Sequence, residues 1–134
     1  MPAPDDPHRA DRPTPGDAVQ LDADALDKLR ALDPDGRHQL LPRVLQTYDS
    51  SARRLLAALA EAGARADWAT AERMVHTLKS SSACIGALDF ARRCGGLEHR
   101  LHVGDHAGIA GELASLDDDG ARVLAAVQAM LRTA

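Results

Sequence analysis

His76 is the residue with the clearest potential for chemistry. It lies in a segment with helical periodicity, but not on the side of that helix where the apolar residues gather (the apolar seam). An α-helix turns by about 100° per residue, so the apolar positions between Trp68 and Ile85 average to a direction roughly 130° away from His76. We therefore expect its imidazole to face solvent. A neutral imidazole nitrogen is a competent nucleophile, and a phosphoryl group placed on it needs a nearby cation and room for a donor to approach.

The residues one and two turns from His76 provide that cation and an open surface. At positions i−4, i+3, i+4 and i+7 they are Glu72, Lys79, Ser80 and Ala83. Side chains at these spacings are neighbours on a helix. Lys79 can supply the positive charge, while Ser80 and Ala83 are small enough to let another protein approach the ring. An exposed histidine beside a lysine is common, so this spacing alone does not define a function.

A longer motif surrounds these residues. The stretch VHTLKSSSACIGA, residues 75–87, resembles the phosphorylation motif of histidine phosphotransfer (HPt) domains, in which His-x-Leu-Lys-Gly-Ser-Ser is followed by a small, apolar continuation and a glycine. Downstream, CGGLE at 94–98 resembles the C-x-x-L-E of the family's next helix, and ADW at 66–68 resembles its usual helix start. Two positions depart from the family pattern: Ser80, where glycine is most frequent, and Cys84, where asparagine is frequent. Serine is still small, although its hydroxyl can alter the approach or bond the imidazole.

The resemblance implies a phosphocarrier that is not an enzyme. His76 would accept a phosphoryl group from an aspartate of a receiver domain and pass it to another receiver domain, and Lys79 would stabilise the group. Glu72, Ser80 and Ala83 would belong to the docking surface. The implied partners are response-regulator receiver domains or a hybrid histidine kinase, and the interface should be transient.

The chain should need no cofactor or metal of its own. In the implied mechanism, Mg²⁺ and a lysine of the receiver domain supply most of the electrostatic stabilisation. The sequence has no Walker A loop, no other glycine-rich nucleotide-binding sequence and no acid–base pair, so nothing indicates that it binds ATP or phosphorylates itself.

Composition excludes several other classes of protein. The 16 basic and 20 acidic residues give a net charge of −4, which does not indicate nucleic-acid binding. The two cysteines, Cys84 and Cys94, form no CxxC pair, and no apolar leader is visible, so we expect a cytoplasmic protein. No apolar run approaches the roughly 20 residues that cross a bilayer. We expect a soluble monomer.

The elements that position His76 are all predicted to be helical. Residues 1–20 hold five of the seven prolines and no apolar period, which predicts a disordered arm before a single domain at 21–134. A short helix with Asp22 as N-cap should end near Asp33. Longer segments with apolar residues every three or four positions follow at about 38–62, 67–86, 87–103 and from 106 onward.

These patterns predict an all-α fold, an antiparallel four-helix bundle with a short additional N-terminal helix packed across one end. We expect Gly63 to follow the first long helix as its C′ residue, and Asp67 to cap the next helix. The stretch from Asp117 to Gly120 can bend or split the last helix.

Two functions from other classes stay open. The chain can be a helical adaptor that binds a signalling partner without carrying phosphate. It can also be a metal-binding bundle, because His99, His102 and His106 are spaced so that two or three imidazoles could share one side of a helix. Against the second function, Gly104 should break the helix between His102 and His106.

Overall fold

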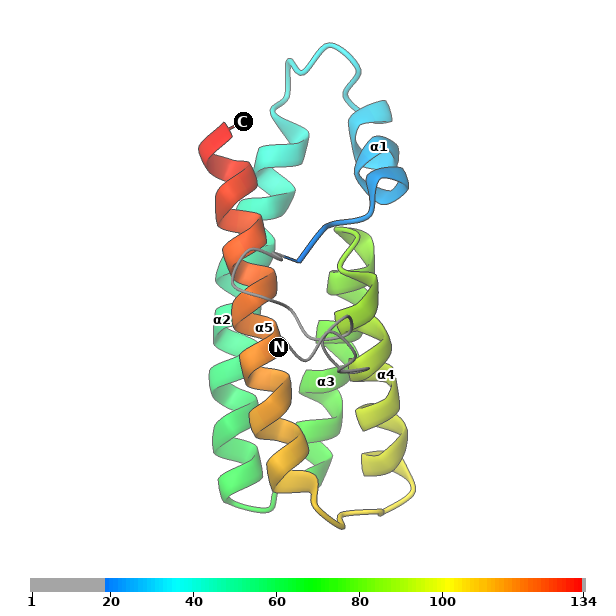
Figure 1. The fold of residues 1–134 in the computed structure, drawn as a ribbon, viewed down its shortest axis with the longest axis vertical. Helices are drawn as coiled ribbons and strands as arrows, with labels where there is room; N and C mark the ends of the chain where they lie inside the picture. Colours follow the sequence, from blue (N-terminus) through cyan, green and yellow to red (C-terminus); the bar gives the residue numbers. More distant parts are fainter. Residues whose placement is uncertain (1–18, 134) are drawn as a thin grey trace, which may run out of the picture.

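The computed structural model describes residues 19–133, which form five α-helices and no strand. In chain order they are α1 (Ala23–Ala31), α2 (Leu40–Ala64), α3 (Trp68–Cys84), α4 (Leu88–His102) and α5 (Ile109–Thr133). The predicted all-helical class is thereby confirmed. Figure 1 shows α2 to α5 running along the long axis, with α1 at one end. The arm predicted for residues 1–20 lies outside the described residues as far as residue 18.

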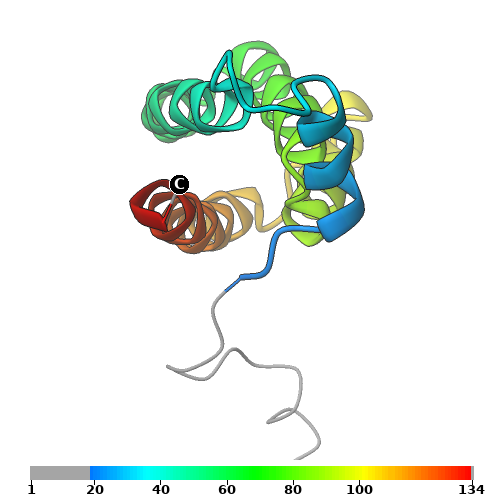
Figure 2. The same cartoon turned by 90° about the horizontal axis from the view of Figure 1, so that it is seen from above.

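The four long helices share one apolar core. Helix α3 packs against α2 and α4, and α5 packs against the same two helices; Figure 2 shows this arrangement from above. Helix α1 contacts α2, and just before α1 the backbone N–H of Asp22 donates to the carbonyl of Gly86 at 2.8 Å. That bond ties the start of the described chain to the turn between α3 and α4. The largest fully buried apolar side chains are Leu45, Leu78, Ile85, Leu116, Val75, Val123 and Val127.

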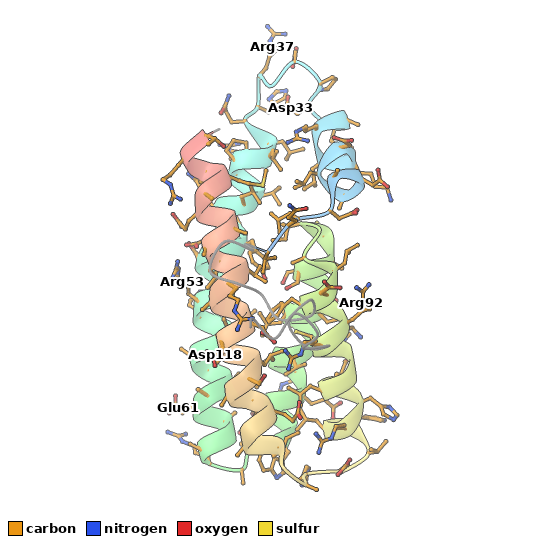
Figure 3. The ribbon with its side chains drawn as sticks, in the orientation of Figure 1. Asp33, Arg37, Arg53, Glu61, Arg92 and Asp118 are labelled. Atoms are coloured by element: carbon orange, nitrogen blue, oxygen red, sulfur yellow. The ribbon has the colours of Figure 1, made fainter. Side chains whose placement is uncertain are left out.

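A buried carboxylate from the preceding loop satisfies the start of α2. Gln39, the residue before this helix, has a left-handed φ of 53° and no side-chain capping bond. The carboxylate of Asp33 instead accepts hydrogen bonds from the backbone N–H groups of His38 and Leu40, each at 3.2 Å. Asp33 lies in the loop between α1 and α2 (Figure 3). Free N–H groups at a helix start need such partners, and here the acceptor comes from the preceding loop, five and seven residues earlier in the chain.

One polar pair lies inside the core and joins α2 to α3. The hydroxyl groups of Tyr48 and Ser82 are 2.8 Å apart, and both side chains are buried. Burial raises the pKa of Tyr48 from 10.0 to about 12, because the phenolate would lose its hydration. A buried pair that satisfies both hydroxyl groups fixes how α3 lies against α2.

Two glycines let α2 and α5 approach closely. A Cβ atom on Gly63 would lie 2.7 Å from Cδ1 of Leu113, and one on Gly120 would lie 2.7 Å from Cδ1 of Leu56. Each helix therefore accommodates a leucine of the other where it has no side chain.

Both glycines lie inside helices. Two predictions are affected: the end of α2 at Gly63 and the course of α5 at residues 117–120. The prediction that Gly63 follows the helix was wrong, because α2 continues to Ala64 and Ala66 takes the positive φ, of 56°. Helix α5 passes through residues 117–120 without a break, so the possible split there does not occur. Packing against the opposite leucine accounts for both glycines inside their helices.

Candidate functional site

Helix α3 positions the candidate site, and its sequence fixes both its start and its orientation. The carboxylate of Asp67 accepts a hydrogen bond from the backbone N–H of Thr70 at 3.2 Å, which confirms the predicted N-cap. Hydrogen bonds from the side chain and backbone of Thr70 lower the pKa of Asp67, so this cap is ionised at neutral pH. Val75 and Leu78 are fully buried on the seam. The face of α3 that carries His76 consequently turns outward.

The imidazole of His76 is exposed and held at one nitrogen. Its side chain has a relative exposure of 60%, and Nδ1 lies 2.6 Å from Oε2 of Glu98 on α4. An ionised carboxylate can only accept a hydrogen bond, so Nδ1 must carry the proton. This tautomer leaves the lone pair on Nε2, so Nε2 is the ring atom that is free to act as a nucleophile.

The second oxygen of Glu98 binds Lys79. The ammonium Nζ lies 2.5 Å from Oε1, and the Glu98 side chain is largely covered, with a relative exposure of 20%. The hydrogen bond from Lys79, and then the one from His76, lower the pKa of Glu98, although partial burial opposes them. Glu98 therefore stays ionised and is shared between an imidazole and an ammonium group.

The structure places the predicted docking residues beside His76. Ser80 and Ala83 are exposed on α3. The hydroxyl of Ser80 donates to the backbone carbonyl of His76 at 3.3 Å and not to its imidazole. Glu72 is half-buried, and its Oε2 lies 3.3 Å from Nδ1 of His102 on α4. Two histidine–glutamate pairs thus connect the helices. In one, α3 provides the histidine and α4 the glutamate; in the other, the roles are reversed.

Glu98 is the residue that sequence reasoning missed. It belongs to the CGGLE stretch that resembled the family pattern, but no role was assigned to it from the sequence. Its contact with His76 joins residues 22 positions apart in the chain, and a helical wheel of one segment cannot show such a contact. The usable signal was an acidic residue directly after a buried leucine, Leu97, on the next helix.

The three histidines considered for a metal site are not gathered. His102 faces Glu72, whereas the ring of His106 stacks against Trp68 with 4.7 Å between centroids. Within residues 19–133, no group of three or more His, Cys, Asp or Glu side chains is placed to hold a metal ion. Cys94 is buried, which raises the pKa of its thiol to about 12, and Cys84 is exposed.

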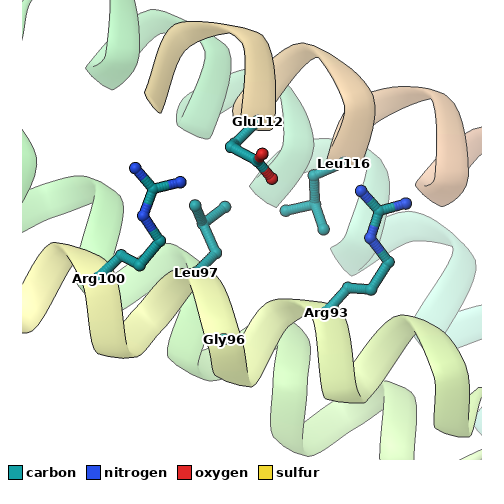
Figure 4. Close-up of a pocket in the computed structure, with 6 residues that line it drawn as sticks. All are labelled: Arg93, Gly96, Leu97, Arg100, Glu112 and Leu116. Carbon is teal, nitrogen blue, oxygen red and sulfur yellow. The ribbon is translucent and has the colours of Figure 1, made fainter. Parts of the chain in front are cut away.

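A cavity of about 270 Å³ lies between α4 and α5, away from His76 (Figure 4). Arg93 and Arg100 project from α4 on either side of Gly96, which has no side chain to fill the space. Both guanidinium groups are already engaged, because Arg93 pairs with Asp119 and Arg100 pairs with Asp105. The cavity therefore offers no free cation and is not part of the site around His76.

The fold and the site together define a class of protein: a helical domain that presents an exposed histidine, bound at one ring nitrogen, on its surface. A comparison with known protein families matches the Hpt domain over residues 43–133, about two thirds of the chain. The chain therefore belongs to the Hpt domain family, whose members are helical phosphocarriers of two-component phosphorelays and interact with receiver domains and histidine kinases. Comparisons with curated proteins and with solved structures gave no match. No helix within residues 19–133 combines the length and apolarity needed to cross a membrane.

Proposed function

We propose that Nε2 of His76 accepts a phosphoryl group from the aspartate of a receiver domain and later passes it to another receiver domain. The observation that carries this proposal is the exposed imidazole whose Nδ1 is held by Glu98. A fixed Nδ1–H keeps the Nε2 lone pair available and directs it away from α4. A nucleophile oriented in this way needs less reorganisation when the donor arrives.

The transfer step requires only the imidazole of this chain and the acyl phosphate of the donor. The Nε2 lone pair attacks phosphorus, the bond from phosphorus to the aspartate oxygen breaks, and its electron pair leaves as the aspartate carboxylate. Positive charge develops on the ring, and the carboxylate of Glu98 stabilises it through the Nδ1 proton. The reverse sequence with a second receiver domain returns the ring to its neutral form.

Lys79 serves the site through Glu98 in the proposed mechanism. Its ammonium keeps that carboxylate ionised and adds positive charge one turn from the ring. Stabilisation of the phosphoryl group by Lys79 is therefore electrostatic at this distance. Mg²⁺ belongs to the receiver domain in this proposal, and the chain contributes no cofactor or metal.

The docking surface we propose is the exposed face of α3 with the neighbouring groove toward α2. Ser80 and Ala83 leave room beside the ring, and Glu72 borders it on the α4 side. An apolar groove of about 310 Å³ lies between α2 and α3 farther along α3 than His76, with Val44 and Ile85 among its lining residues. A small apolar surface on the helix that carries the reactive atom suits a transient complex.

The remaining features of the proposal concern the whole chain. We propose a single domain at 21–134 preceded by an arm at 1–20, and a monomer that works in the cytoplasm. The packing of α3 and α5 each against α2 and α4, with short connections, supports an antiparallel four-helix arrangement with α1 as an additional helix.

Phosphotransfer from labelled receiver domains tests the function. The wild-type chain is mixed with receiver domains carrying radiolabelled phosphate, and acid-labile label on the chain is followed. We expect His76→Gln to remove the label and His99→Gln, which changes an exposed histidine on α4, to retain it. If no receiver domain of the same cell labels the wild-type chain, the phosphorelay function is wrong. Binding without label would identify a helical adaptor instead.

A further inference from the structure

Arg73 lies one turn before His76 on α3, on the opposite flank of the imidazole from Lys79. At about 100° per residue, position i−3 is displaced by about 60° to one side of His76 and position i+3 by about 60° to the other. Lys79 is on the flank toward α4, where its ammonium binds Glu98. Arg73 is therefore on the flank away from Glu98.

The two cations differ in their partners. Lys79 is held by a carboxylate, so much of its charge is already balanced. The side chain of Arg73 is exposed, and among the described residues its guanidinium donates one hydrogen bond, from Nη2 to the hydroxyl of Thr70 at 3.2 Å. Within residues 19–133 no carboxylate forms an ion pair with it, and its effect on the pKa of Asp67 acts through space. Its charge is thus available to another anion.

Arg73 also shares a cavity with the nucleophile. A cavity of about 370 Å³ is lined by Glu72, Arg73, His76, Thr77 and Glu98. Because the Nδ1–H points to Glu98, Nε2 points away from that carboxylate, toward the exposed side of the ring. A phosphoryl group on Nε2 adds about two negative charges beside two glutamates. Arg73 is the arginine on that cavity wall, and its planar guanidinium fits two phosphoryl oxygens.

We propose that the guanidinium of Arg73 contacts the phosphoryl group on Nε2 of His76 and stabilises it both during transfer and in the phosphorylated chain. This inference rests on the proposed function of His76. Arg73 neither gains nor loses a proton; it moves from the Thr70 hydroxyl to the phosphoryl oxygens. Glu98 and Lys79 then orient the ring, while Arg73 balances the charge that the ring receives.

A donor too small to dock separates this role from partner recognition. Phosphoramidate labels exposed histidines without a receiver domain, so its labelling rate and the half-life of the phosphohistidine depend on this chain alone. We expect Arg73→Gln to lower both quantities about twofold to fivefold, as for an exposed charge-assisted bond. Arg73→Lys should restore part of the loss. The matched control is Arg122→Gln on α5, which removes an exposed, ion-paired arginine away from α3 and should change neither quantity.

Three outcomes separate the inference from the proposed function. If phosphoramidate labels wild-type and Arg73→Gln chains equally, with equal half-lives, the inference is wrong and the proposed function stands. If Arg73→Gln lowers the labelling rate only with receiver-domain donors, Arg73 belongs to docking, and the inference is again wrong. Absence of label at His76 in the wild-type chain would overturn the proposed function and the inference together. Circular dichroism verifies that each variant is folded.

Discussion

Replacing Glu98 by glutamine should slow phosphotransfer without abolishing it. The carboxylate receives hydrogen bonds from Nδ1 of His76 and Nζ of Lys79, at 2.6 and 2.5 Å. A neutral amide oxygen of similar shape can accept one of these bonds, but it cannot balance the positive charge that develops on the ring. The effect of the substitution is therefore expected in the transition state more than in the resting protein.

The exposure of both partners sets the size of this effect. A hydrogen bond to a charged group contributes about 1.5–3 kcal/mol when it is shielded from water. The side chains of His76 and Lys79 are 60% and 38% exposed, so solvent screening reduces the contribution to about 0.5–1 kcal/mol. That loss corresponds to a transfer rate about twofold to fivefold lower.

Two measurements check the prediction for Glu98→Gln. Initial rates of label transfer from a phosphorylated receiver domain give the kinetic effect, and NMR of the imidazole nitrogens reports whether Nδ1 or Nε2 carries the proton. Glu61→Gln is the matched control, because it removes the same charge from an exposed ion pair, with Arg65 at the end of α2, outside the proposed docking surface. A wild-type rate with an unchanged tautomer would refute the reasoning. So would a loss as complete as that of His76→Gln.

Two further predictions concern the framework that holds α3. Gly86→Ala should lower the free energy of unfolding by about 2 kcal/mol or more, measured by denaturant titration, because Gly86 has a φ of 85° and a Cβ would lie 2.6 Å from the backbone nitrogen of Asp22; unchanged stability would contradict this. Tyr48 is the single tyrosine of the chain, so its absorbance change should report ionisation only near pH 12. Because its pKa is higher in the folded chain than the usual 10.0, its contribution to stability should be complete below pH 10 and lost as the pH rises toward 12. A tyrosine that titrates near 10 in the folded chain would show that the phenol is not buried in the core.

Local signals predicted the parts of the fold that depend on neighbouring residues. The N-cap of Asp67 was predictable because a capping side chain acts on a backbone N–H three residues away. The outward direction of His76 followed from helix periodicity alone, since the buried residues Val75 and Leu78 define the seam. The end of α2 was misjudged at Gly63, because glycine signals both a helix end and a close helix contact, and only the position of Leu113 distinguishes them.

The candidate site was predictable on one helix and not across two. The residues expected around His76 lie on α3, so their spacing could be read from the sequence. The partner of the imidazole, Glu98, comes from α4, and its approach depends on the register with which α4 packs against α3. Lys79 illustrates this limit: its spacing predicted a cation beside His76, but it could not predict that the ammonium binds Glu98.

The α2–α5 pair should tolerate substitutions far better than insertions. Gly63 receives Leu113, and Gly120 receives Leu56, so two contacts fix the same pair of helices at two heights. One residue inserted between Leu113 and Gly120 would rotate the rest of α5 by about 100°, and only one of the two contacts could then form. A redesign of partner specificity on this scaffold can therefore vary exposed residues of α3 outside the site around His76, but it must keep the residue count between Leu113 and Gly120.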